Sequence, residues 1–241
     1  LMQRNGATPA TRFIRFVLDR ENRLRLGLRP QANGSVDVLS RSSDGAWSVL
    51  FAIPFEDVPL SSPIAFEAGG NSFLMFDSAG RDRAVLMRVD AETGGKTVLG
   101  ESARADVADV WLDAASNAPE AFAANYLRTE WRALELEAQA DLEFLDAQLS
   151  GDFSVTSRSA DDARWIVVEE APTTPARTYL YDRTDRNARR ISLLFRHRPG
   201  LENAPLQPMT PIEIEARDGL TLVSYLTLPI GADTNGDARP E

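Results

Sequence analysis

Residues able to perform catalysis are scarce in this 241-residue chain. It contains no cysteine, so thiol nucleophiles, thiolate metal sites and disulfides are all excluded. Its one histidine, His197, lies between Arg196 and Arg198 in the segment FRHRPG. The two flanking guanidinium groups disfavour the imidazolium that a general base must become, so we expect a linker or surface histidine. The sequence offers no residue that we can assign a catalytic role.

Motifs that bind phosphate or metal ions are also missing. The patterns G-x-x-x-x-G-K-[ST] and G-x-G-x-x-G do not occur, nor does the serine-hydrolase pattern G-x-S-x-G. In DTNGDARPE, Asp233, Asn235 and Asp237 follow the 1, 3, 5 spacing of a calcium loop. Ala238 stands where that loop requires glycine, so we expect a polar loop, with a calcium-dependent module as the alternative. We assign no catalytic, cofactor-binding or metal-binding residue.

The net charge of the chain limits the classes of partner that it can bind. Its 36 acidic residues outnumber 26 lysines and arginines, which gives a formal net charge of −10. Phosphate backbones and anionic membrane surfaces are repelled by such a chain, so we expect neither as a partner. No apolar run approaches the roughly 20 residues of a membrane helix. The chain begins with Leu1 and has no apolar signal core, so we expect the true N-terminus upstream and leave the compartment open.

Short strands separated by polar turns make up most of the sequence. Asp44, Asp90 and Asp182 lie in similar turns at spacings of one and then two steps of about 46 residues. A repeat of this length made of four strands is typical of β-propeller blades. We therefore predict a mainly β fold with about four blades, and an antiparallel sandwich is the alternative. The expected blades cover residues 12–55, 63–102, 105–136 and 152–196.

One segment departs from the strand pattern and predicts an inserted amphipathic helix over about 130–149. Its apolar residues recur at steps of three and four, and Ser150-Gly151 ends it. They are Trp131, Leu134, Ala138, Leu142, Leu145 and Leu149. The rest of its surface carries Glu135, Glu137, Asp141, Glu143 and Asp146. We expect a solvated acidic face, and recognition of a substrate amine is the functional alternative.

The amino-acid composition changes after the last expected blade. Residues 199–210 are rich in proline and read as a linker, so we expect the partial propeller to occupy residues 1–198. Beyond it, PIEIEARDG and LTLVSYLTLP read as two strands joined at Asp218-Gly219. A lone hairpin is marginally stable in water, so these strands need a larger sheet. Residues 211–241 therefore look like the start of a second domain.

The order of these segments resembles the prolyl oligopeptidase family of serine peptidases (the S9 group), particularly bacterial dipeptidyl aminopeptidases and acylaminoacyl peptidases. The resemblance is carried by DVADVWLD, YLRTEWRALELEAQADLEFL, GDFSVTSRSADDARWIVV and the stretch from TYLYDRTDRN to RDGLTLVSYLTLPIG. It covers essentially the whole chain and is most specific from Thr129 to Gly231. It implies a β-propeller that caps an α/β-hydrolase domain, with residues 211–241 as the first hairpin of that domain.

The resemblance also implies a function. Family members hydrolyse short peptides by acyl transfer through a Ser-Asp-His triad, and the propeller restricts access to it. The oxyanion motif and the triad follow the hairpin in the family, so no catalytic residue can be carried over. We expect this chain alone to be inactive and to need no cofactor, while the full-length protein takes peptide substrates.

Family propellers have more than four blades, so we expect truncation at both ends and self-association through exposed sheet edges. The alternative function is a stand-alone β-propeller that binds a partner without chemistry. The coding sequence beyond Glu241 separates the two, because a peptidase needs a G-x-S-x-G followed by Asp and His. Substrate length, residue preference and the choice between endo- and exopeptidase action stay open.

Overall fold

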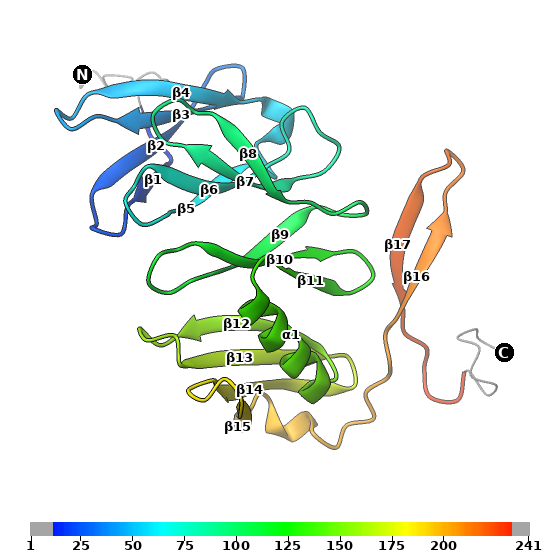
Figure 1. The fold of residues 1–241 in the computed structure, drawn as a ribbon. Coiled ribbons are helices and arrows are strands. Elements are labelled where there is room, and N and C mark those ends of the chain that lie inside the picture. Colours follow the sequence, from blue (N-terminus) through cyan, green and yellow to red (C-terminus); the bar gives the residue numbers. More distant parts are fainter. Residues whose placement is uncertain (1–11, 233–241) are drawn as a thin grey trace, which may run out of the picture. The chain divides into compact units, whose positions relative to one another are not determined.

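The computed structural model describes residues 12–232, which contain seventeen strands and one α-helix (Figure 1). The fold is mainly β, as predicted. The expected polar loop at Asp233, Asn235 and Asp237 lies outside the described residues. The chain divides into two compact units, residues 1–112 with 116–124 and residues 113–115 with 125–241. In residues 12–232, no helix is long and apolar enough to cross a membrane.

The first sheet of the first unit is an antiparallel meander of four consecutive strands. Its strands are β1 (Arg15–Leu18), β2 (Leu24–Pro30), β3 (Val36–Arg41) and β4 (Trp47–Ile53). Alternate residues of β3 point to opposite faces, so Val36 and Val38 are buried while Asp37 between them is not. Gly45 turns the chain between β3 and β4 with a φ of +91°. This sheet corresponds to the first predicted blade.

A second four-stranded meander follows a short 3₁₀ turn at Phe55–Asp57. Its strands are β5 (Ser62–Phe66), β6 (Ser72–Asp77), β7 (Val85–Asp90) and β8 (Lys96–Gly100). The two sheets share a core in which Leu26, Val38, Phe73 and Val89 are completely buried. Each such side chain stabilises the fold by about 1.5–3 kcal/mol relative to an exposed one.

The first unit ends with β9 (Val107–Leu112) and β10 (Pro119–Asn125), which pair antiparallel. Phe122 packs on Gly100 so closely that a Cβ there would lie 2.6 Å from the ring. Glycine is therefore required at the end of β8 for the strands to approach.

The second unit contains β11 (Thr129–Ala133) and the helix α1 (Leu136–Gln148). The prediction that the helix begins near residue 130 is wrong, because residues 129–133 form a strand. These residues are hydrogen-bonded in a sheet, and Trp131 stacks on Phe153 with ring centroids 6.5 Å apart, so tertiary interactions override the helical spacing. Ala138, Leu142 and Leu145 of the predicted apolar stripe are buried in α1, whereas Leu134 precedes the helix and Leu149 follows it.

Four further strands form the last meander of the second unit. They are β12 (Asp152–Arg158), β13 (Arg164–Ala171), β14 (Thr174–Asp182) and β15 (Arg190–Arg196). They coincide with the predicted blade at 152–196. Trp165 and Tyr181 are completely buried and meet edge to face, with centroids 5.3 Å apart.

The repeated turns occupy equivalent positions. Asp44 lies in the turn between β3 and β4, and Asp90 and Asp182 are the last residues of β7 and β14, so all three stand where the third strand of a four-stranded sheet leads into the fourth. In each turn the aspartate carboxylate accepts a hydrogen bond from the backbone N–H of the residue two positions later, with N···O distances of 3.0, 3.1 and 2.9 Å. The spacing seen in the sequence therefore reports a structural repeat.

A proline-rich segment separates the last meander from a two-stranded sheet, β16 (Thr210–Glu215) and β17 (Thr221–Leu226). Gly219 makes the turn with a φ of +82°, and Leu220 donates its N–H to Asp218. Ile214 and Leu222 are about half exposed. The hairpin thus presents half-exposed apolar side chains, and in residues 12–232 its two strands pair with no further strand.

Candidate functional site

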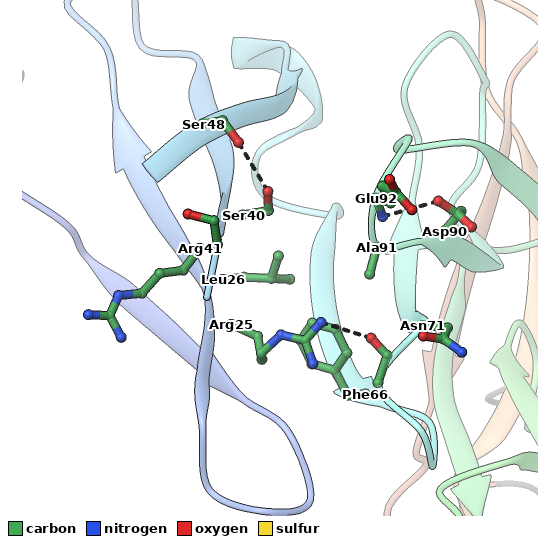
Figure 2. A pocket seen from close by; sticks show the side chains of 12 residues that line it. Arg25, Leu26, Ser40, Arg41, Ser48, Phe66, Asn71, Asp90, Ala91 and Glu92 are labelled. Carbon is green, nitrogen blue, oxygen red and sulfur yellow. Dashed lines mark hydrogen bonds between the residues drawn. The ribbon is translucent and has the colours of Figure 1, made fainter. Parts of the chain in front are cut away.

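A polar cleft of about 500 Å³ lies between the two four-stranded sheets of the first unit (Figure 2). The first sheet contributes Arg25 and Leu26 from β2 and Arg41 from β3. The second sheet contributes Phe66 from β5 and Glu92 from the turn after β7. Its volume lies within the range of small-molecule sites, although its lining is more polar than usual.

Arg25 is held in place inside this cleft. Its Nη1 donates to Asp19 at 3.1 Å, its Nη2 donates to the carbonyl of Gly70 at 2.9 Å, and the guanidinium lies 4.9 Å from the Phe66 ring centroid (Figure 2). Gly70 has a φ of +70°, and a Cβ there would lie 2.5 Å from Arg25 Nη1. Glycine is therefore needed for this contact, and Arg25 is oriented before any ligand arrives.

Asp19 neutralises the arginines on β2 and on the turn before it. It accepts hydrogen bonds from the backbone N–H of Arg23 at 2.9 Å and from Arg23 Nε at 2.8 Å. Burial alone would raise the pKa of Asp19, but these bonds and the one from Arg25 lower it to about 2. Arg23 also pairs with Glu21 at 2.9 Å. Two carboxylates thus balance two guanidinium groups.

Arg41 has a different environment. Its guanidinium lies 5.9 Å from the Trp47 ring centroid, and it forms no ion pair with any residue in 12–232. A second hollow of about 640 Å³ shares Arg25, Arg41 and Ser42 with the cleft and adds Arg23. No carboxylate belongs to the lining of this hollow. Arg41 is therefore the surplus positive charge of the site.

Carboxylates stand on the opposite wall of the cleft. Asp90 accepts hydrogen bonds from the backbone N–H groups of Thr93 at 2.7 Å and Glu92 at 3.1 Å, and these bonds lower its pKa. The side chain of Glu92 is exposed and forms no ion pair within residues 12–232. The cleft therefore has a positive end and a negative end.

The lining of this cleft pairs charged groups with hydroxyl groups. Ser40 and Ser48 face each other with hydroxyl oxygens 3.3 Å apart, and no base accompanies them. The sole histidine, His197, belongs to the second unit, where it is exposed and its Nε2 lies 2.9 Å from the hydroxyl of Thr178. The cleft was not found from the sequence, because its residues come from six separate segments.

A second cluster of charges lies in the second unit and is buried. Asp141 on α1 accepts hydrogen bonds from Tyr181 at 2.5 Å and from Arg189 at 2.7 Å, and its other oxygen lies 3.0 Å from Arg183. Burial and the bond to Asp141 raise the pKa of Tyr181. The expected solvated acidic face is therefore wrong at Asp141, because arginines of the β14–β15 segment reach the helix.

The other acidic residues of the helix divide into two groups. Glu137 binds Arg189 at 2.6 Å and Arg186 at 3.1 Å. Glu135, Glu143 and Asp146 are exposed, as expected.

Trp165 completes the buried cluster. The guanidinium groups of Arg158 and Arg183 lie 3.9 and 4.5 Å from its ring centroid. Asp162 accepts from the Trp165 indole at 2.7 Å and from Arg183 at 2.9 Å. Each charge meets an opposite charge or a ring, so the cluster fixes the helix on the sheet.

Comparison with known proteins finds similar peptidases and hydrolases. The chain is 40% identical over 241 residues to dipeptidyl aminopeptidase BIII of Pseudoxanthomonas mexicana, covering all of this chain and 34% of that protein. Its fold is similar to puromycin hydrolase, with a TM-score of 0.58, 15% identity, and coverage of 89% of this chain and 33% of the other. Prolyl oligopeptidase B from Galerina marginata gives a TM-score of 0.55 at 14% identity, over 87% and 30% of the two chains. No protein-family model matches the sequence.

The chain thus spans about a third of the length of the relatives it matches. The part that it matches is their propeller portion, which confirms the predicted partial β-propeller.

Proposed function

This chain is a homologue of the prolyl oligopeptidase family (S9) peptidases, and on that premise we propose that it is the propeller portion of a serine peptidase. The proposed full-length enzyme hydrolyses short peptides by acyl transfer, and the propeller limits which peptides reach the active site. The 40% identity over the whole chain to dipeptidyl aminopeptidase BIII carries this proposal. By its name, that relative removes dipeptides from the amino end of its substrates.

The terminal hairpin supports the same assignment. β16 and β17 pair only with each other among residues 12–232, and Ile214, Leu222 and Tyr225 are about half exposed. Two strands bury too little apolar surface to be stable alone. A catalytic domain whose sheet begins with this hairpin would cover these side chains, as the resemblance to the family implies.

We place the catalytic triad of the enzyme outside these 241 residues. The placement of the histidine supports this, because His197 is exposed and contacts Thr178 and Phe195. A triad needs a serine within hydrogen-bond reach of the imidazole and a carboxylate on its other nitrogen.

Labelling with a fluorophosphonate tests the proposal, since this probe reacts with activated serines. The full-length protein is expected to be labelled and to hydrolyse chromogenic dipeptide amides, and the 241-residue chain to do neither. Denatured full-length protein is the control for non-specific labelling. Labelling of the 241-residue chain would show that it holds a nucleophile, and an unlabelled, inactive full-length protein would refute a serine peptidase.

A binding propeller without catalysis is the second candidate, and the polar cleft of the first unit favours it. The coding sequence beyond Glu241 separates the two. A G-x-S-x-G followed by Asp and His supports the peptidase, whereas an immediate stop codon supports the binding protein.

Self-association through exposed sheet edges stays a prediction. The edge strand β15 has large exposed side chains at Leu194 and Phe195. Sedimentation of the full-length protein at several concentrations checks it, and a constant monomer mass would contradict it.

A further inference from the structure

We propose that the cleft between the two sheets of the first unit, together with the hollow beside it, binds a short peptide as a zwitterion. The carboxylate of the peptide pairs with Arg41, and its ammonium group pairs with Glu92. This site is independent of hydrolysis and goes beyond the proposed peptidase function.

The balance of charges selects a monoanion at the positive end. Arg23 and Arg25 are neutralised by Asp19 and Glu21, which bind them at 2.8–3.1 Å. Arg41 remains with a net single charge and no ion pair in residues 12–232. A carboxylate matches one guanidinium in charge and in planar geometry, whereas a phosphate dianion would need a second free cation.

The arginines are also arranged for recognition. Arg25 is fixed by Asp19, Gly70 and Phe66, and its two hydrogen bonds use two of its five N–H donors. Its remaining donors can bind carbonyl oxygens of a peptide. Arg41 rests against Trp47, so its position is restrained although it lacks a carboxylate partner. Fixed donors lose less entropy on binding than free ones.

The two hollows give the ligand its direction. Figure 2 shows Arg25 pointing across the cleft toward Phe66 and Asn71, while Arg41 points the other way. Arg25, Arg41 and Ser42 line both hollows, so the two hollows are neighbours, and the proposed ligand runs past these three residues from one into the other. Glu92 stands on the far wall of the cleft and is exposed. A carboxylate near Arg41 therefore leaves the amino end of the peptide on the Glu92 side.

Triglycine and two blocked forms test the proposal with the intact chain. Calorimetry compares triglycine with its C-terminal amide, which lacks the negative charge, and with its N-acetyl form, which lacks the positive charge. We expect saturable binding of triglycine and roughly tenfold weaker binding of either blocked form, since a charge-assisted hydrogen bond is about twice as strong as a neutral one. Equal affinity for the acid and the amide would overturn the proposal, as would no saturable binding up to millimolar triglycine.

Matched variants locate the site. Arg41→Gln is expected to weaken triglycine binding about tenfold and to leave the amide unaffected, because the two changes remove the same contact. Glu92→Gln is expected to weaken triglycine binding about tenfold and to leave binding of the N-acetyl form unchanged. Arg83→Gln is the control, since Arg83 pairs with Asp82 and lines neither hollow. An effect of Arg83→Gln equal to that of Arg41→Gln would place binding elsewhere.

A competition experiment fixes the chemistry of the anion. Acetate is expected to displace triglycine and inorganic phosphate to displace it no better. Stronger competition by phosphate would overturn the assignment to a carboxylate. Melting temperatures of the variants show whether they fold, and the blocked peptides test the wild-type chain even if a variant does not.

Discussion

Arginine and carboxylate side chains cluster twice in the described chain, and the two clusters differ in how far water reaches them. Under α1 in the second unit, the side chains of Arg183 and Asp141 are 2% and 0% exposed. In the first unit, Arg23 lines the second hollow and Arg25 lines both hollows, and their side chains are 62% and 28% exposed. In the buried cluster each charged side chain lies beside an opposite charge, although among the described residues Asp141 Oδ2 accepts no hydrogen bond and Arg183 Nε donates none. In the open cluster Arg41 and Glu92 form no ion pair in residues 12–232.

Because both clusters are rich in arginine, arginine content alone does not identify a binding site. A buried charge must be compensated within the protein, because its desolvation costs several kcal/mol. An exposed charge needs no partner within the protein, because water solvates it until a ligand binds. The number of carboxylates available to each guanidinium, taken together with burial, separates a structural cluster from a recognition site.

The largest expected effect is in the buried cluster. Asp141→Asn removes the one fully buried carboxylate that Arg183 and Arg189 share and leaves each of them with a single close partner, Asp162 and Glu137, so we expect a loss of about 3 kcal/mol in the free energy of unfolding. Urea denaturation of the chain measures it. Asp146→Asn, on the exposed part of the same helix, is the control and should change stability by less than about 0.5 kcal/mol. Similar values for both variants would remove the distinction between the clusters.

A smaller effect is expected where the open cluster is most constrained. Gly70→Ala and Gly80→Ala both place alanine at a φ of +70°, which costs about 1–2 kcal/mol. At Gly80 nothing lies within 4 Å of the new Cβ, whereas at Gly70 it displaces Arg25 and breaks a hydrogen bond worth about 1 kcal/mol. Thermal unfolding of both variants gives the difference. Equal destabilisation would mean that Arg25 is not held by Gly70.

The pH dependence of stability tests the ion pairs of the open cluster. The pKa of Asp19 is lowered to about 2 in the folded chain, from an ordinary 3.8. The folded state thus binds fewer protons than the unfolded state, and the contribution of Asp19 is complete above about pH 4 and is lost as the pH falls toward 2. We expect the stability difference between wild type and Asp19→Asn to shrink from pH 5 to pH 2 in urea denaturation. With Asp82→Asn, an exposed aspartate, a difference of the same size and slope would argue against a special role for Asp19.

The smallest effect is expected at Arg41. Because no carboxylate in residues 12–232 depends on it, Arg41→Gln should change the free energy of unfolding by less than about 0.5 kcal/mol. Arg183→Gln, the corresponding change in the buried cluster, should cost several kcal/mol because it leaves Asp141 and Asp162 short of a partner. Chemical denaturation of the two variants compares the arginines directly. A large loss at Arg41 would reveal a structural role and weaken the case for a free recognition group.

The repeat of strands could be predicted from the sequence because its signals are local. Asp44, Asp90 and Asp182 make the same hydrogen bond to a residue two positions away, so their spacing is visible without tertiary structure. The start of α1 could not be placed in the same way. Residues 129–133 form a strand of a hydrogen-bonded sheet, and Trp131 stacks on Phe153; neither the pairing nor the stacking can be read from the spacing of apolar residues.

The charged sites were beyond sequence reasoning for a related reason. Asp141 has the same local surroundings as Asp146 on an acidic helix, yet only Asp141 meets Tyr181, Arg183 and Arg189. The cleft draws Arg25 and Glu92 from segments nearly seventy residues apart. Its one local signal was the pair Gly69-Gly70, whose left-handed backbone permits the close approach of Arg25.

Each four-stranded sheet of the described chain is made of consecutive strands joined by short turns. Closing a short loop costs little entropy, so pairing within one sheet does not wait for residues from another. Packing between sheets, by contrast, joins residues that are far apart in the chain and belongs to a later step of folding. On the ribosome, a sheet of this kind can form once its fourth strand has emerged, while the rest of the protein is still being synthesised.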